Sequence, residues 1–528
     1  MISTPAWPFD NFSFHKSLHN NSSTQNPMEE KMTTKVADHS GGLARRSVTP
    51  FEVLAQSVAN IAPSAVIAFG PGVMALYAGN GAWFSFVIGM GIILIVAHTV
   101  AVFARRRAGA GSLYSLVRPA LGPWGSLVTG WALFIGVIAI ASGSLAGAGF
   151  FASAFLEGLG ANLFQPMVGQ IVLDAILLAI AVYLTISGVR IAARVSATLE
   201  VLSIIVIIVM LVIVIVSSGN IFDSAQLTLT DATFDGMVFA VVLAILGFVG
   251  FESAAALGEE AQDPYRAIPR AIRRGAIFAG ILYIFATYVQ VAAFEGGAEG
   301  LGKSLSPMDD LAAQYGLDGF VPLLNLGFAA SFMAVVIACM TVAARLLFAW
   351  GNEGLISSWF GQAHPKHRTP ARAIYTIIPL VFLPMAIVLS LGVAPLGATT
   401  YIDTVGVFGY MFSYILVCIG APIFLKKTKG KNVIFTMVLG IVGALSLLYV
   451  FYRNVWPIPA TPLDSLPIYF IVALIVGVVF FAILRIRKPA VAAQAGTFAD
   501  DNPDDDTDEN TDDNTDEPSV QPEKITLT

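Results

Sequence analysis

One acidic side chain, Glu252, lies inside a long apolar run in which a nearby glycine can interrupt the helix. The run from Gly236 to Leu257 contains GFVGFES, in which Glu252 follows Gly250 by two residues. A carboxyl group among apolar residues is costly to bury as an anion, so it can exchange a proton or hydrogen-bond to a neighbour. Glycine lowers helix propensity, which leaves backbone groups near Gly250 without their helical partners. The sequence therefore indicates a protonatable group beside exposed backbone dipoles.

A second interruption lies in the first apolar run, which contains NIAPSAVIAFGPG from Asn60 to Gly72. Pro63 removes a backbone donor and clashes with the preceding turn, and Pro71 lies between two glycines. N–H groups that begin a helix after such a break attract an anion, and unwound carbonyl groups attract a cation. A small zwitterion would use both. The alternative is a pair of packing kinks, because glycine and proline are common in membrane helices.

The composition indicates that these breaks lie in a lipid environment. Of the 528 residues, 56% are hydrophobic and only 12% are charged, with a mean hydropathy of +0.76. Soluble domains carry about a quarter charged residues, so the composition excludes an ordinary soluble enzyme, and the net charge of −6 argues against nucleic-acid binding. The two cysteines exclude a disulfide framework and a cysteine-based metal site.

Twelve apolar runs are long enough to be membrane-spanning helices, and they are too long for the strands of a barrel. They are 51–78, 82–104, 124–156, 168–187, 193–217, 236–257, 275–294, 320–350, 373–392, 399–425, 433–452 and 466–486.

The basic residues between these runs predict an orientation. With both termini in the cytoplasm, all of the 29 Lys and Arg residues except Lys303 and Arg453 fall on the inner side. The positive-inside rule therefore favours an even number of spans in the cytoplasmic membrane. We expect a disordered N-terminal segment at 1–49, a twelve-helix domain at 50–488 and an acidic disordered tail at 489–528.

The two interrupted runs, the first and the sixth, each begin a group of five. Five is odd, so the two runs enter the membrane from opposite sides. Interrupted helices at matching places in two opposed halves are the best sequence indication of a transporter site near the bilayer midplane.

Several stretches carry a family resemblance. The segment GFVGFESAAALGEEAQDPYRAIPRAI (247–272) resembles the sixth-helix signature of the amino acid–polyamine–organocation superfamily, and SVANIAPSAVIAFGPG, AGAGSLYSLVRPALGPWGSLVTGW and ARLLFAWGNEGLI are similar to other parts of that family. The resemblance implies an all-α LeuT-type fold with a 5+5 inverted repeat and discontinuous first and sixth helices. It also implies secondary transport of an amino acid or related amine by alternating access.

The resemblance further implies a site. The substrate carboxylate would meet the N–H groups of Ser64, Ala65 and Val66, after Pro63. Its amine would meet carbonyl groups near Ile61, Ala62 and 246–249, and Phe248 or Phe251 would close over it. The complete set of substrate-binding candidates adds Ser144 from a stripe of small residues and is Ile61, Ala62, Pro63, Ser64, Ala65, Val66, Leu246, Gly247, Phe248, Val249, Phe251 and Ser144.

The expected coupling or gating residues are Glu252, Ser203 and Asp403. Some proton-coupled relatives carry a lysine in the fifth helix, where this chain has Ser203 or a neighbour, so a lysine-based proton mechanism is unsupported. Asp403 lies near the outer end of the tenth run and could act as a gate or face water. Glu200 and Arg345 are expected near inner helix ends, where they would pair or extend towards water. Glu259 and Glu260 are expected to pair with the arginines that follow them.

The sequence contains no cluster of residues at metal-binding spacing, no phosphate loop and no nucleophile elbow, so we expect no enzyme activity, cofactor or metal. The expected partners are a small-molecule substrate, a coupling ion and the lipid bilayer, with no nucleic acid. An amino acid is the first substrate hypothesis, and a polyamine or another organic amine is the second. Proton symport is favoured because of Glu252, with sodium symport and exchange as alternatives. A sensor or channel is the third hypothesis, and the oligomeric state is open.

Overall fold

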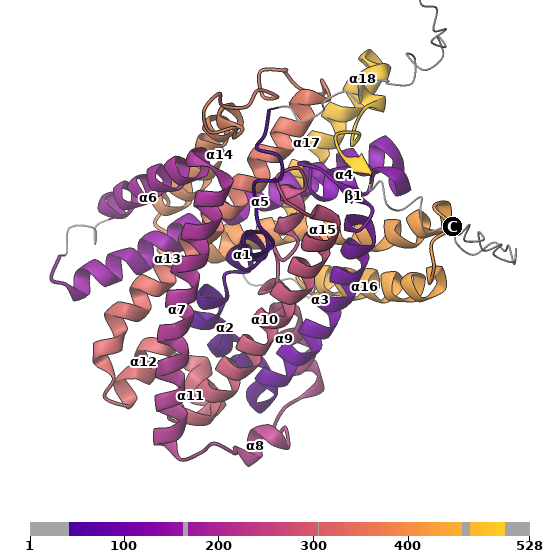
Figure 1. The fold of residues 1–528 in the computed structure, drawn as a ribbon. Helices are drawn as coiled ribbons and strands as arrows, with labels where there is room; N and C mark the ends of the chain where they lie inside the picture. Colours follow the sequence, from indigo (N-terminus) through magenta and orange to yellow (C-terminus); the bar gives the residue numbers. More distant parts are fainter. Residues whose placement is uncertain (1–41, 162–166, 305, 457–464, 502–528) are drawn as a thin grey trace, which may run out of the picture. The chain divides into compact units, whose positions relative to one another are not determined.

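A computed structural model describes residues 42–161, 167–304, 306–456 and 465–501, and its regular structure is almost entirely helical (Figure 1). The elements are α1 (Pro50–Ile61), α2 (Pro63–Ala78), η1 (Gly79–Gly81), α3 (Ala82–Ala104), β1 (Arg107–Ala108), α4 (Leu113–Leu116), α5 (Arg118–Gly158), α6 (Met167–Ser187), α7 (Val189–Ser218), α8 (Ser224–Leu227), α9 (Phe234–Leu246), η2 (Ser253–Leu257), α10 (Pro264–Ala293), α11 (Gly297–Lys303), α12 (Pro307–Gln314), η3 (Asp318–Phe320), α13 (Val321–Asn352), α14 (Ala371–Ser390), α15 (Pro395–Lys427), α16 (Val433–Arg453), α17 (Leu466–Arg487), α18 (Pro489–Ala493) and β2 (Asp500–Asp501).

Ten segments in the described part of the chain are helical, apolar and long enough to cross a membrane. The sequence analysis expected twelve spans, and two features of the chain account for the different number. First, α1, α2, η1 and α3 follow one another with only Ala62 between α1 and α2, and they count as a single segment of 55 residues, Pro50–Ala104. Second, the run around Glu252 is divided, because α9 ends at Leu246 and a short 3-10 turn follows.

The helices divide into a buried core and a periphery. The apolar window of α13 is entirely buried, whereas α6 and α17 bury only 28% of theirs. The peripheral helices expose large aliphatic and aromatic side chains, among them Ile434, Ile468 and Tyr469. Contiguous apolar exposure of this kind is costly in water and favourable in lipid.

Small residues let α5 and α15 pack closely. An ideal Cβ at Gly409 of α15 would lie 2.4 Å from the carbonyl oxygen of Ala132 on α5. An ideal Cβ at Gly136 of α5 would lie 2.9 Å from Cδ2 of Tyr410 and 3.1 Å from the carbonyl oxygen of Gly406, both on α15. Small residues at helix contacts are typical of membrane proteins, where van der Waals packing replaces the hydrophobic effect between helices. The small-residue stripe of α5 is therefore used in packing.

The first interruption lies between α1 and α2. The α1 helix begins with a capping box in which Thr49 and Glu52 satisfy each other's backbone N–H groups. It ends at Ile61, and Ala62 takes left-handed dihedrals (φ 50°, ψ 63°) before Pro63 starts α2. An L-residue in this region costs energy, so the surrounding contacts must hold the turn in place.

The second interruption runs from Gly247 to Glu252 and separates α9 from η2 (Ser253–Leu257). Gly250 has φ +98°, which an L side chain rarely adopts. A Cβ at this position would also lie 2.6 Å from Nδ2 of Asn60. Glycine is therefore required both for the backbone turn and for the close approach of α1.

The chain outside the spanning helices is ordered further than the sequence analysis expected. Before α1, Val48 pairs with Ala261 in a parallel bridge. After α17, residues 489–501 form α18 and β2, whereas the sequence analysis placed the start of a disordered tail at residue 489. The strand β2 pairs antiparallel with β1. Residues 1–41 and 502–528, where the remainder of the two expected tails falls, lie outside the described residues.

Glu353, at the end of α13, holds the segment between α18 and β2. Its carboxylate accepts hydrogen bonds from the N–H groups of Gly496 (3.2 Å) and Phe498 (2.8 Å) and from the hydroxyl of Tyr114. Burial raises the pKa of Glu353 to about 7, although the hydrogen bonds from Tyr114 and the backbone lower it.

A pair of Gly→Ala substitutions should distinguish the effect of close helix packing on stability from the effect of helix propensity. Gly409→Ala would force α5 and α15 apart because the new methyl group meets the backbone of Ala132. The expected loss is about 1–3 kcal/mol, measured as a lower unfolding temperature in detergent. Gly91→Ala on α3 is the control, because nothing lies within 4 Å of an added Cβ there. Equal unfolding temperatures for the two variants would contradict the close packing.

Docking of residues 495–499 should depend on pH. Because the pKa of Glu353 is raised in the docked state, docking is fully favourable below the ordinary glutamate pKa and weakens as pH rises through about 7. The amide protection factors of this segment in hydrogen exchange should therefore fall between about pH 4.5 and 7, by at most about tenfold per pH unit, and level off above pH 7. Glu353→Gln should remove the pH dependence, and a wild-type protection factor constant over this range would refute it.

Candidate functional site

The backbone N–H groups that follow the first interruption already have acceptors in this structure. Ser64 donates to Oε1 of Glu200 at 2.9 Å, and Ala65 donates to Oγ of Ser331 at 3.2 Å. Val66 donates to the carbonyl of Ala62 at 3.2 Å. The first of these acceptors is a carboxylate, so the start of α2 favours an anion, as the exposed N–H groups and the helix dipole require.

Glu200 was expected near an inner helix end, and this expectation was wrong. The side chain lies within α7, is 1% exposed and contacts the start of α2. Its second oxygen, Oε2, has no hydrogen-bond partner among the described residues. The apolar residues around it in the sequence gave no sign of this contact, because Ser64 lies 136 residues earlier in the chain.

Arg345 was expected to pair or to extend towards water, and it forms a buried ion pair. Its guanidinium donates to both oxygens of Glu260, at 3.1 and 2.5 Å, and both side chains are at most 2% exposed. Glu260 therefore pairs with α13, whereas the sequence analysis assigned it to the arginines of α10. Near this pair, the N–H of Val48 donates to the carbonyl of Glu260 at 2.8 Å. These contacts join α13 to the segments that precede α1 and α10.

At the second interruption, side chains from other helices satisfy the exposed backbone groups. Tyr414 of α15 accepts a hydrogen bond from the N–H of Gly250 (3.1 Å) and donates its own proton to Oε2 of Glu252. Tyr283 of α10 donates to the carbonyl of Gly247 at 2.9 Å. Ser57 of α1 donates to the carbonyl of Phe251. The backbone of 247–251 is therefore held by α1, α10 and α15.

Asn60, the last polar residue of α1, connects the two interruptions. Its Nδ2 lies 3.3 Å from both the carbonyl of Gly250 and the hydroxyl of Tyr410. Its Oδ1 accepts a hydrogen bond from Sγ of Cys339 on α13 at 3.0 Å. The described structure thus joins α1, the second interruption, α13 and α15 in one buried polar network.

Glu252 belongs to this network and is 1% exposed. The described part of the chain shows no ion pair to Glu252, and the neutral hydroxyl of Tyr414 donates a hydrogen bond to its carboxyl group. A buried carboxyl group with an uncharged partner can take up a proton without separating an ion pair. It is therefore chemically suited to carry one.

The two candidate aromatic residues lie on different sides of the interruption. Phe251 is fully buried with its ring 5.2 Å from that of Tyr414, next to the polar network. Phe248 packs against Phe86 of α3 and Tyr283 of α10, at 6.5 and 5.2 Å. Phe251 is therefore the better placed of the two to contact a molecule held between α1 and α15.

The remaining candidates lie elsewhere in the core. Ser144 is buried on α5. Ser203 follows Glu200 by three residues on α7, and its Oγ, which has no partner among the described residues, packs on Gly327 of α13. Asp403 of α15 lies against Gly143 of α5, and its buried Oδ1 also lacks a hydrogen bond within the described ranges. No hydrogen bond between described residues joins Ser203 or Asp403 to Glu252.

Sequence reasoning missed Asn60, Tyr410, Tyr414 and Cys339 as parts of the site. The spacing of Tyr410 and Tyr414 gave one usable signal, because residues four apart share a helix face. Cys339 is buried, and nothing in the sequence around it signals its hydrogen bond to Asn60.

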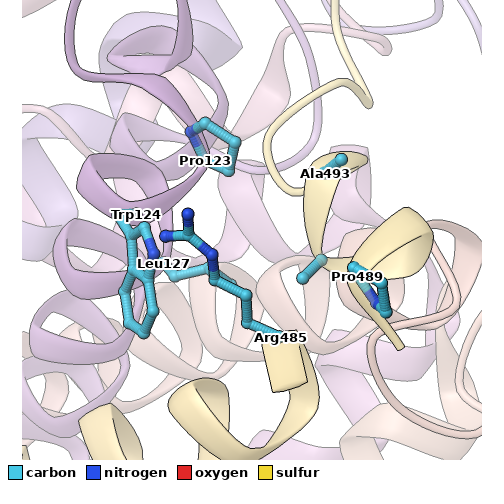
Figure 2. Close-up of a pocket in the computed structure, with 7 residues that line it drawn as sticks. Pro123, Trp124, Leu127, Arg485, Pro489 and Ala493 are labelled. Atoms are coloured by element: carbon cyan, nitrogen blue, oxygen red, sulfur yellow. The ribbon is translucent and has the colours of Figure 1, made fainter. Parts of the chain in front are cut away.

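A surface pocket lies away from the interruptions. It has a volume of about 330 Å³ and is lined by the start of α5, the end of α17 and α18 (Figure 2). Its lining is almost entirely apolar, and the guanidinium of Arg485 lies 5.5 Å from the ring of Trp124. None of the candidate substrate-binding residues lines it. In the described part of the chain, no group of three or more His, Cys, Asp or Glu side chains could hold a metal ion.

Sequence comparison relates the chain to known transporters. Residues 51–481 match the family model described as amino acid permease. The branched-chain amino acid permease BcaP of Bacillus subtilis is 24% identical over 312 residues, which cover 57% of this chain and 66% of that permease, just under two thirds. BcaP of Lactococcus lactis is 25% identical over 445 residues, covering 77% of this chain and 89% of the relative. The low-affinity putrescine importer PlaP of Escherichia coli is 24% identical over 311 residues, covering 55% and 64%.

Structure comparison agrees with this placement at the level of the fold. The crystal structure of MhsT in complex with L-phenylalanine matches with a TM-score of 0.55 and 13% identity, covering 77% of this chain and 98% of MhsT. MhsT has the LeuT-type fold, and at this identity the likeness concerns the fold alone. Because the family model spans most of the sequence, the chain belongs to the amino acid permease family.

Proposed function

We propose that this permease is a secondary active transporter that moves an amino acid across the cytoplasmic membrane by alternating access, coupled to protons. The observation that carries the proposal is the buried network through Asn60, which joins both helix interruptions to α13 and α15. Next to this network, main-chain N–H and carbonyl groups at the two interruptions have side chains of other helices as their hydrogen-bond partners. A zwitterion requires both, because its carboxylate binds N–H groups and its ammonium group binds carbonyl oxygens.

In the proposed complex, the carboxylate takes the N–H groups of Ser64, Ala65 and Val66. The ammonium group takes carbonyl oxygens near Ile61, Ala62 and 246–249, and Phe251 covers the site. The names of the two BcaP relatives support an amino acid substrate. The name of PlaP supports the second candidate, a polyamine or related amine. An amine without a carboxylate would leave the N–H groups of α2 to their present acceptors.

Alternating access requires contacts that close one side of the site and can separate. The ion pair of Arg345 with Glu260 and the bridge of Val48 with Ala261 have this character. They join the segment before α1, the C-terminal part of α13 and the segment before α10. In the proposed topology, these parts lie on the cytoplasmic side. We place both termini in the cytoplasm, count twelve spans in two inverted groups of five plus two, and assign the described conformation to the state closed on that side.

The test of this function is uptake by the full-length protein in liposomes. Uptake of a radiolabelled amino acid mixture is measured with each of the twenty amino acids and putrescine as unlabelled competitor. The uptake is driven in turn by an inward pH gradient, an inward sodium gradient or unlabelled substrate inside the liposomes. Saturable amino acid uptake that is driven by the pH gradient is the expected result. Competition by putrescine and plain amines alone would favour the second candidate, and ion current without saturable uptake would contradict both.

Replacing the carboxyl group at the second interruption should separate proton coupling from substrate movement. Glu252→Gln keeps the size of the side chain and a hydrogen-bonding group for Tyr414 but cannot release a proton. Uptake driven by a pH gradient should fall by tenfold or more, whereas exchange between equal internal and external pools should remain. Tyr414→Phe is the companion variant, because it removes the partner and leaves the acid. Loss of exchange together with driven uptake in Glu252→Gln would assign Glu252 a structural role instead.

A further inference from the structure

We infer that Glu200 occupies the binding place of the substrate carboxylate, so that substrate binds only when Glu200 has taken up a proton. The inference rests on the proposed function, because it assumes that a carboxylate-bearing substrate binds at the start of α2. It assigns proton coupling to a residue that the sequence analysis placed elsewhere.

The contact between Glu200 and α2 has the geometry of a bound anion. Oε1 of Glu200 lies 2.9 Å from the backbone nitrogen of Ser64, the second residue of a 16-residue helix. Both side chains are at most 1% exposed. The carboxylate therefore already uses one of the three N–H groups that a substrate carboxylate would need.

Unsatisfied polar atoms surround this contact. Oε2 of Glu200 and Oγ of Ser64 are buried and make no hydrogen bond of normal distance and angle among the described residues, although the hydroxyl groups of Ser64 and Ser331 lie next to the Glu200 carboxyl group. Buried polar groups without partners are uncommon and costly in folded proteins. An arriving ligand with hydrogen-bonding capacity, or a proton on Glu200, would satisfy them. The start of α2 therefore has hydrogen-bonding capacity beyond its present contact with Glu200.

The groups that face Glu200 carry little charge. Ser64 of α2 and Ser331 of α13 are neutral. Tyr283 of α10 is a titratable side chain close enough to interact electrostatically with Glu200. Arg194 on the same helix is six residues away, about 9 Å along the axis, and is paired with Glu52 of α1 at 2.6 Å. A second carboxylate brought next to an ionised Glu200 would meet uncompensated repulsion.

Protonation removes this conflict. A proton from water on the side of higher proton concentration binds to an oxygen of Glu200 and neutralises it. Ser64 then transfers its N–H hydrogen bond from Oε1 of Glu200 to an oxygen of the substrate carboxylate. When the substrate leaves on the other side, Glu200 loses the proton to water and takes back the N–H of Ser64. Glu200 therefore carries one proton with each substrate molecule, separate from the proton proposed for Glu252, and no covalent bond other than O–H forms or breaks.

The test measures the pH dependence of substrate binding to the purified full-length protein. The probes are the amino acid returned by the uptake screen, beginning with L-leucine, and its methyl ester, which has no carboxylate. For the wild type, the dissociation constant of the amino acid should rise up to about tenfold per pH unit as Glu200 ionises. For Glu200→Gln, it should be independent of pH and at least tenfold lower than the wild-type value at pH 8. The methyl ester should show no such pH dependence in either protein.

A second readout reports the proton directly. Infrared difference spectra recorded on adding the amino acid should show the C=O band of a newly protonated carboxyl group in the wild type and not in Glu200→Gln. Asp174→Asn is the matched control, because Asp174 is also a buried carboxyl group but lies on α6 with Gln170 as its partner. This control should keep both the band and the pH dependence.

The possible outcomes separate the inference from the function on which it rests. If no amino acid binds to the wild type at any pH, the proposed function fails and the inference fails with it. If an amino acid binds but Glu200→Gln keeps the wild-type pH dependence and the infrared band, the inference fails and the proposed function stands.

Discussion

The structure depends on one constraint, which is that buried backbone groups must be hydrogen-bonded where no water reaches them. A continuous helix satisfies this requirement alone, but the interruptions at Ala62 and at 247–252 do not. Side chains from distant helices therefore supply the missing partners: Glu200 and Ser331 at the first interruption, and Asn60, Ser57, Tyr283 and Tyr414 at the second. This requirement explains why polar residues lie in otherwise apolar helices.

The same constraint links stability to function. In the proposed mechanism, partners that are side chains are exchanged for groups of a ligand, and the carboxylate of the substrate replaces the carboxylate of Glu200. The backbone of a regular helix offers no such exchange, since each of its N–H groups is already bonded within the helix. Rigid packing elsewhere, such as the close contact of Gly409 with Ala132, holds the frame within which these exchanges take place. In the proposed transport cycle, the ion pair of Arg345 with Glu260 is a contact that separates when the site opens.

The sequence was sufficient to locate the interruptions and to identify the family. Proline at 63 and glycine at 250 have local effects on the backbone, and the resemblance of 247–272 to its superfamily was confirmed by the match over residues 51–481. The sequence was insufficient to assign partners across the fold. Asn60 and Tyr410 are separated by 350 residues, and their hydrogen bond depends on how α1 and α15 pack. The prediction for Glu200 was wrong because an ionisable side chain near a helix end is usually exposed to water. Here the start of α2 provides an N–H donor for Glu200 inside the core.

The central claim is that the N–H groups at the start of α2 bind the carboxylate of the substrate. A structure of the full-length protein with its amino acid bound tests this most directly, through the distance from the backbone nitrogen of Ser64 to the nearest carboxylate oxygen. Our account predicts that a substrate oxygen lies at hydrogen-bonding distance, about 3 Å, and that Glu200 has moved away from Ser64. A substrate bound elsewhere, with Ser64 still donating to Glu200, would contradict it.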